Sequence, residues 1–74
     1  MNATRHRALT LLEDEGPLTA REVAEVLGSR REAASMLLQR ARNDGLVHYG
    51  RRTGQHVLSQ RGHDRLAWLR GKAS

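Results

Sequence analysis

Two short helical patterns separated by only two or three residues constrain the fold of this chain more than any other feature. The first covers about residues 20–27, with Thr19 as a candidate cap and Glu22 three residues later, the spacing of a reciprocal capping box. Gly28 then ends this helix, and the second pattern covers about residues 30–44. Because such a short connection packs two helices at a steep angle, the sequence predicts a helix-turn-helix.

The second of these helices has an apolar stripe on one side and polar residues on the other. Ser29 is its candidate N-cap, with Glu32 at the reciprocal position, and Gly45 suits the left-handed residue that ends a helix. The apolar positions repeat with the helical period: Ala34, Leu37, Leu38 and Ala41. Burial of this stripe turns the polar side toward solvent.

A helix before this pair and a helix near the C-terminus are also predicted. Apolar residues recur at helical spacing over about residues 4–15, and Pro17 cannot continue that helix. Ser59 can cap a last helix, of which we expect residues 71–74 to be frayed.

The hydrophobic period changes from helical to alternating after the helix-turn-helix. Residues 46–49 and 55–59 are typical of two short strands around a tip at residues 50–54. The predicted fold is therefore α+β, a winged helix-turn-helix with three helices, a two-stranded β-hairpin wing and a C-terminal helix. We expect it to form a single domain over residues 1–74.

The charge of the chain favours an anionic partner. Its 74 residues carry a formal net charge of +5, and 12 of its 13 basic residues are arginine, whose planar guanidinium matches phosphate and guanine. The chain has no cysteine, which excludes disulfides and thiolate metal sites. It has no apolar block long enough for a signal peptide or a membrane span, so we expect a cytoplasmic, nucleoid-associated protein with no membrane partner.

Three groups of residues are candidates for contact with double-stranded DNA. The polar side of the helix over residues 30–44 would enter the major groove, the hairpin tip would contact the minor groove or its phosphates, and the start of the helix over residues 20–27 would lie near a phosphate. In that order, the residues are Arg30, Arg31, Ser35, Met36, Gln39 and Arg40, then Arg51, Arg52 and Thr53, then Thr19 and Arg21. A solvated helix face and charges that keep a hairpin tip in water are the alternative interpretations.

The run from Leu18 to Gly28, the Gly45-Leu46-Val47 segment and residues 58–66 together resemble the winged helix-turn-helix of MarR-type transcriptional regulators. This resemblance covers about residues 8–70. It implies that the helix over residues 30–44 is the recognition helix, or reading helix, with contacts at Arg30, Arg31, Ser35, Met36 and Arg40. It also implies a wing with contacts at Arg51 and Arg52.

The chain departs from the MarR pattern in two ways. It has Ser29 after the turn glycine, and it has the small residues Ala34 and Ala41 where family members carry bulkier ones, so we expect the reading helix to sit closer to its neighbours. Full-length MarR regulators carry further terminal helices that form the dimer and an effector pocket, and this chain is too short for them. We therefore expect no small-molecule effector.

The last helix offers a candidate interface for a reduced homodimer, formed by Leu66, Trp68 and Leu69. The alternative is that these residues pack within the chain against the first helix. A homodimer would place two reading helices on successive major grooves, about 34 Å apart, and would bind a palindromic site.

No metal, cofactor or catalytic group is expected. The chain has four histidines without metal-ligand spacing, although His48 and His56 could face each other across the hairpin. No paired carboxylates and no nucleophile motif occur at a recognisable spacing, so we expect no enzyme. The sequence predicts a small transcriptional repressor, with a protein-interaction module or an architectural DNA-binding accessory factor of a mobile element as the alternatives.

Overall fold

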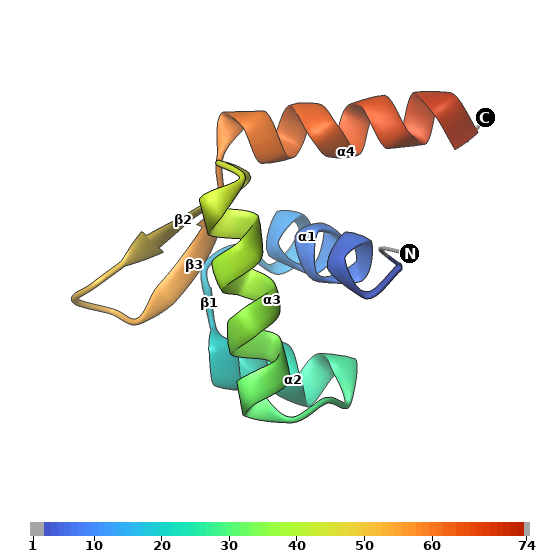
Figure 1. Ribbon diagram of the computed structural model, residues 1–74. Coiled ribbons are helices and arrows are strands. Elements are labelled where there is room, and N and C mark those ends of the chain that lie inside the picture. Colours follow the sequence, from blue (N-terminus) through green and yellow to red (C-terminus); the bar gives the residue numbers. More distant parts are fainter. Residues whose placement is uncertain (1–2, 74) are drawn as a thin grey trace.

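The computed structural model describes residues 3–73 and has the predicted α+β architecture of a winged helix-turn-helix (Figure 1). Its elements in chain order are α1 (Ala3–Glu15), β1 (Leu18–Thr19), α2 (Ala20–Leu27), α3 (Arg31–Asn43), β2 (Val47–Gly50), β3 (Gln55–Leu58) and α4 (Gln60–Ala73). Figure 1 shows the β2–β3 hairpin projecting to one side of the helices, with α2 and α4 at opposite ends of α3. The predicted fold class is therefore confirmed.

The helix α2 is closed at both ends by local hydrogen bonds. At its start, the Glu22 N–H donates to Thr19 Oγ1 at 3.2 Å and the Thr19 N–H donates to Glu22 Oε1 at 2.9 Å, which is the predicted capping box. At its end, Gly28 takes a φ of 67°, and the Ser29 N–H donates to the Ala24 carbonyl at 3.0 Å. These bonds satisfy backbone groups that a helix end leaves open, and they define the turn into α3.

The predicted Ser29 cap of α3 is wrong. The N-cap is Arg30, which makes no side-chain capping bond, and the helix begins at Arg31. The Ser29 N–H closes α2, and the Ser29 hydroxyl donates to the Arg30 carbonyl at 3.3 Å. Because Ser29 is held by the end of α2, it belongs to the turn, and α3 starts one residue later than predicted.

The helix α3 ends in a left-handed turn that leads into the wing. Gly45 has a φ of 77°, and its N–H donates to the Arg42 carbonyl at 3.0 Å. The Leu46 N–H donates to the Ala41 carbonyl at 2.9 Å, and both of these residues are buried. The two bonds form a Schellman ending, so the predicted Gly45 cap is confirmed.

The wing belongs to a three-stranded antiparallel sheet in which β3 lies between β1 and β2. The prediction of a two-stranded hairpin omitted β1, whose Leu18 pairs with His56. On the other side of β3, Tyr49 pairs with His56 and His48 pairs with Val57. The expected facing of His48 and His56 is therefore wrong, because residues one position apart on a strand lie on opposite faces of the sheet.

The helix α4 is anchored at the corner where α3 meets β2. The Gly62 N–H donates to Ser59 Oγ at 3.0 Å, which confirms the predicted cap, and the Ser59 hydroxyl donates to the Gly45 carbonyl at 2.6 Å. A Cβ at Gly62 would lie 2.2 Å from the Leu46 carbonyl oxygen and 2.8 Å from a methyl carbon of Leu58. The close approach of α4 to this corner therefore requires glycine.

A hydrophobic core joins the helices to the wing. Its buried members are Ala8, Leu9, Leu12, Val23, Ala24, Ala34, Leu38, Ala41, Leu46, Val47 and Leu66. Leu37 of the predicted α3 stripe is partly buried against this core. At the surface, Glu13 of α1 forms an ion pair with Arg70 of α4 and lies 3.7 Å from His63 Nδ1. The hydrogen bond from Arg70 lowers the pKa of Glu13, and these contacts link α4 to α1.

The helix α4 continues to Ala73, and the expected fraying of residues 71–74 stays a prediction. Ser74 lies outside the described residues.

His56 places an imidazole in the sheet beside the core, with only 6% of its surface exposed. Burial lowers the pKa of His56, a hydrogen bond with the Leu18 backbone opposes this shift, and the positive charge of Arg42 adds to it. The folded chain therefore binds a proton at His56 less readily than the unfolded chain does.

The substitution Gly62→Ala should destabilise the fold by about 2 to 3 kcal/mol, the upper part of the range for overpacking, because the new methyl group meets a backbone oxygen. The matched control is Gly71→Ala in the same helix, where a Cβ meets no atom of the described residues within 4 Å. This control should keep or raise the stability, by up to about 1 kcal/mol. Urea unfolding followed by circular dichroism measures both, and equal stabilities of the two variants would contradict the packing argument.

The free energy of unfolding should fall as the pH decreases below about 6.5, the ordinary pKa of histidine, because the unfolded state then binds more protons than the folded state. His56 contributes a slope of at most about 1.4 kcal/mol per pH unit, down to its lowered pKa in the folded state. His56→Phe should flatten the profile between about pH 5 and 6.5. His48→Phe, on the neighbouring strand, should keep the wild-type slope, and the opposite ranking of the two variants would refute the assignment.

Candidate nucleic-acid interface

The polar side of α3 faces solvent, as the sequence indicates. The six candidate contact residues on this helix and its N-cap are all exposed: Arg30, Arg31, Ser35, Met36, Gln39 and Arg40. On the opposite side, Ala34, Leu38 and Ala41 are buried in the core. Packing of the small apolar stripe therefore fixes which side chains a partner of α3 meets.

A groove lies between the start of α2, the exposed side of α3 and the wing, with a volume of about 510 Å³; we call it the α3–wing groove. Five of the predicted contact residues line it: Thr19, Arg21, Arg31, Ser35 and Gln39. Ala20, at the predicted start of α2, also lines it, together with four residues that were not predicted as contacts: Arg42, Tyr49, Gly54 and His56. Arg30, Met36 and Arg40 are exposed on the helix but do not line the groove.

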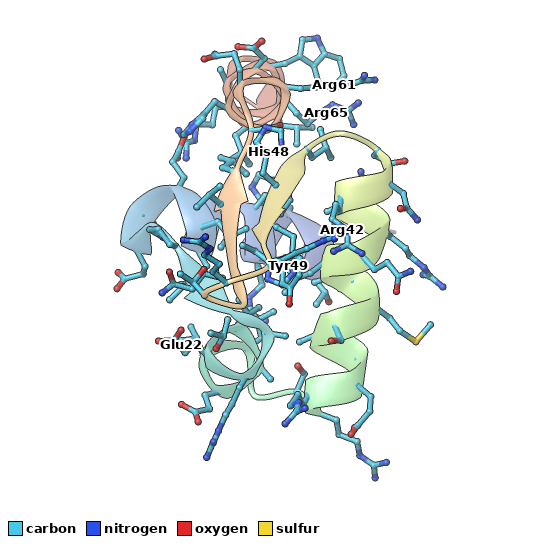
Figure 2. All side chains as sticks on the ribbon, turned by 90° about the vertical axis from the view of Figure 1, so that its left-hand side faces the viewer. Glu22, Arg42, His48, Tyr49, Arg61 and Arg65 are labelled. Atoms are coloured by element: carbon cyan, nitrogen blue, oxygen red, sulfur yellow. The ribbon has the colours of Figure 1, made fainter. Side chains whose placement is uncertain are left out.

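A stack of three side chains connects α3 to the wing across this groove. The Arg42 guanidinium carbon lies 5.2 Å from the centre of the Tyr49 ring, and the Tyr49 and His56 rings lie 4.8 Å apart at an angle of 43°. Figure 2 shows Arg42 reaching from α3 toward Tyr49. A guanidinium over an aromatic face is attracted by the ring quadrupole, so this contact holds Arg42 at the wing.

The sequence carries a signal for Arg42 that the prediction did not use. Arg42 follows Gln39 by three residues and Ser35 by seven, so it lies on the same side of the helix as these two groove residues. Tyr49 and His56 have no comparable signal, because their contact depends on the strand register.

Thr19 and Thr53 have structural roles besides their place at the surface. Thr19 Oγ1 caps α2, and Thr53 Oγ1 accepts a hydrogen bond from the Gln55 N–H at 3.2 Å in the wing tip. The neighbouring Arg51 and Arg52 are both exposed at this tip.

Most guanidinium groups at the candidate interface are free of carboxylate partners. Within residues 3–73, no carboxylate oxygen lies within 4.0 Å of a guanidinium nitrogen of five of the predicted contact residues: Arg30, Arg31, Arg40, Arg51 and Arg52. Arg21 lies 3.6 Å from Glu25 one turn later, and both side chains are largely exposed. Such an exposed pair contributes only about 0.3 to 0.5 kcal/mol, so Arg21 can exchange it for a phosphate.

The three residues expected at a dimer interface differ in how far they are exposed to solvent. Leu66 is fully buried in the core, which corrects its assignment to an interface, because it offers no surface to a second copy. Leu69 is half-buried, and Trp68 is 58% exposed.

The described residues hold no group of three or more His, Cys, Asp or Glu side chains that is placed to bind a metal ion. None of the helices within residues 3–73 combines the length and the apolar character that crossing a membrane requires.

Three solved structures share this fold. A MarR family protein from Bacillus stearothermophilus has a TM-score of 0.89 at 23% identity, over 97% of this chain and 53% of that protein. A MarR-like transcriptional regulator from Thermotoga maritima has a TM-score of 0.75 at 21% identity, over 90% and 51%. A protein from Mycobacterium tuberculosis has a TM-score of 0.74 at 25% identity, over 84% and 46%. The present chain thus spans about half the length of these proteins.

Comparison with curated protein sequences finds no match. A family model described as the MarR family matches residues 1–56, which is most of the chain. Together with the fold, this match shows that the chain belongs to the MarR family.

Proposed function

We propose that the chain binds double-stranded DNA as a transcriptional regulator and acts as a repressor by covering a promoter. In this proposal α3 lies in the major groove and the wing contacts the minor groove or the flanking phosphates. The main support for the proposal is the α3–wing groove, whose lining within residues 3–73 includes Arg21, Arg31 and Arg42 and no carboxylate. This groove has the charge of a phosphate-binding surface and lies along a helix that presents hydrogen-bonding side chains.

The exposed residues of α3 have the chemistry needed to read base edges. Gln39 can form two hydrogen bonds with adenine, Arg31 and Arg40 can do the same with guanine, and Met36 can contact a thymine methyl group. The arginines of the wing, Arg51 and Arg52, supply charge beside this reading surface.

The proposal extends to a homodimer through α4. Trp68 and Leu69 remain candidate interface residues after Leu66 is assigned to the core. The relatives of known structure are about twice as long as this chain, and one of them is described as a transcriptional regulator, so regulation is carried to this chain as part of the proposal. Neither a cofactor nor a small-molecule effector is part of it.

Replacement of Arg51 and Arg52 by alanine should weaken binding to all duplexes, because these residues contact phosphates in the proposal. Each phosphate contact contributes about −0.9 to the slope of log affinity against log salt, so the double variant should reduce the steepness of this slope by up to about 1.8. Fluorescence anisotropy at a series of salt concentrations measures the slope.

The control for this variant is Arg7→Glu, which changes the net charge by the same two units. Arg7 lies on α1 beside Val26 and Leu27, outside the α3–wing groove. The control should keep nearly the wild-type slope. Wild-type binding that does not weaken with salt would overturn the proposed function.

Replacement of Gln39 or Arg40 by alanine should change the preferred DNA sequence, because a base contact discriminates by about 1 to 3 kcal/mol. Selection of bound duplexes from a random pool measures the preference of each variant. The wing variant is the control, since it should keep the wild-type motif at lower affinity. A palindromic motif supports the homodimer. An unchanged motif in both helix variants contradicts the reading role of α3, and binding without a motif favours the architectural alternative.

A further inference from the structure

A second hollow shares Arg42 and Tyr49 with the α3–wing groove. It is about 620 Å³ in volume, at the junction between the last turn of α3 and the strand β2. Its lining consists of Arg42, Gly45, Val47, His48, Tyr49 and Arg51, and contains no carboxylate. Arg42 lines both hollows and is held at the boundary between them by the Tyr49 ring.

Two arginines of α4 extend this positive surface. The Arg61 side chain lies against the corner of the second hollow, since a Cβ at Gly45 would be 3.5 Å from Arg61 Cδ. Arg65 follows four residues later and therefore lies on the same side of α4. In Figure 2 both side chains extend from α4 toward the side of the molecule on which α3 lies, above Arg42 and Tyr49.

Two acidic residues close in sequence to this surface make polar contacts with residues outside it. Asp44, at the end of α3, forms an ion pair with Arg5 at 2.6 Å. Asp64, between the two arginines of α4 in sequence, accepts a hydrogen bond from Gln60 Nε2 at 3.1 Å. No ion pair of Arg42, Arg51, Arg61 or Arg65 occurs within residues 3–73.

Four basic residues of α4 are divided between two sides of the helix. Arg70 and His63 face α1, where they contact Glu13. Arg61 and Arg65 are exposed on a different side of α4 from these two residues. An exposed guanidinium without a carboxylate partner provides charge for an anionic partner.

We propose that Arg61 and Arg65 extend the DNA contact into a flanking surface, which shares Arg42 and Arg51 with the α3–wing region and binds backbone phosphates beyond the segment that α3 reads. This inference rests on the proposed function, because it assumes that the bound partner is a duplex. The flanking surface adds affinity without sequence preference, since phosphate contacts carry no base information. It also makes the footprint of the chain longer than α3 and the wing alone would require.

The test compares wild type with Arg61→Ala/Arg65→Ala on a mixed-sequence duplex of about three helical turns. The variant should bind more weakly and with a shallower salt dependence. When the salt concentration is raised fourfold, the affinity of the wild type should fall by up to about tenfold more than that of the variant. This difference is the effect of two phosphate contacts. The lysine variant Arg61→Lys/Arg65→Lys should restore the salt dependence, and Arg7→Glu serves as the control for net charge.

Arg65→Ala alone covers the case in which loss of the packed Arg61 side chain disturbs the corner at Gly45. Its salt slope should change by about 0.9, the effect of one phosphate contact and half of the change in the double variant. Its melting temperature should equal that of the wild type. Both alanine variants should retain the sequence motif of the wild type in the selection experiment.

Shortening the duplex gives an independent readout. When the DNA is trimmed to the segment covered by α3 and the wing, wild type and the double alanine variant should bind equally. Equal affinity and equal salt slope on the long duplex would overturn the flanking surface and leave the proposed function intact. Failure of the wild type to bind any duplex would overturn the proposed function and this inference with it.

Discussion

The corner at Gly45 and Leu46 determines how the rest of the molecule is arranged. Here α3 ends, β2 begins and α4 packs, and the same few backbone groups hold all three. The Leu46 carbonyl accepts the Ser59 N–H at 2.9 Å, the Gly45 carbonyl accepts the Ser59 hydroxyl, and Gly62 lets α4 approach without a Cβ. Because this corner sets the direction of the wing and of α4 relative to α3, it also places the arginines of all three elements relative to one another.

Two of the eight acidic residues of the chain are paired with arginines outside the α3–wing groove and the second hollow. Asp44 and Glu13 are both held in ion pairs that connect α1 to other elements, through Arg5 and Arg70. These carboxylates thus offset charge on the side of the molecule where α1 lies. Within residues 3–73, the linings of the α3–wing groove and the second hollow contain no carboxylate. The positive charge of their guanidinium groups is therefore not neutralised inside either hollow.

Much of the fold could be predicted from interactions between residues close in sequence. The features that the sequence did not predict depend on contacts between residues far apart in sequence. The Thr19 cap and the left-handed Gly45 follow from residues within one helical turn, so the sequence indicated both. Ser29 was misassigned because two helix ends compete for it and only the structure shows which one wins. The strand β1 has two residues and therefore no periodicity, and the place of Tyr49 beside His56 depends on a register that the hairpin sequence did not determine. The role of Gly62 arises from its contact with Leu46, sixteen positions earlier.

A homodimer is part of the proposal because base contacts provide sequence selectivity and phosphate contacts do not. Phosphate contacts raise the affinity for every sequence equally, whereas each base contact discriminates by about 1 to 3 kcal/mol. In the proposed complex one α3 offers few side chains for bases, and the wing and the flanking surface would add only sequence-independent attraction. A single copy would therefore bind tightly with limited selectivity. Since the costs of separate mismatches add, a second copy on a repeated half-site doubles the discrimination without any further reading residue. A cationic domain this small thus gains selectivity more readily by pairing two copies than by adding charge to one.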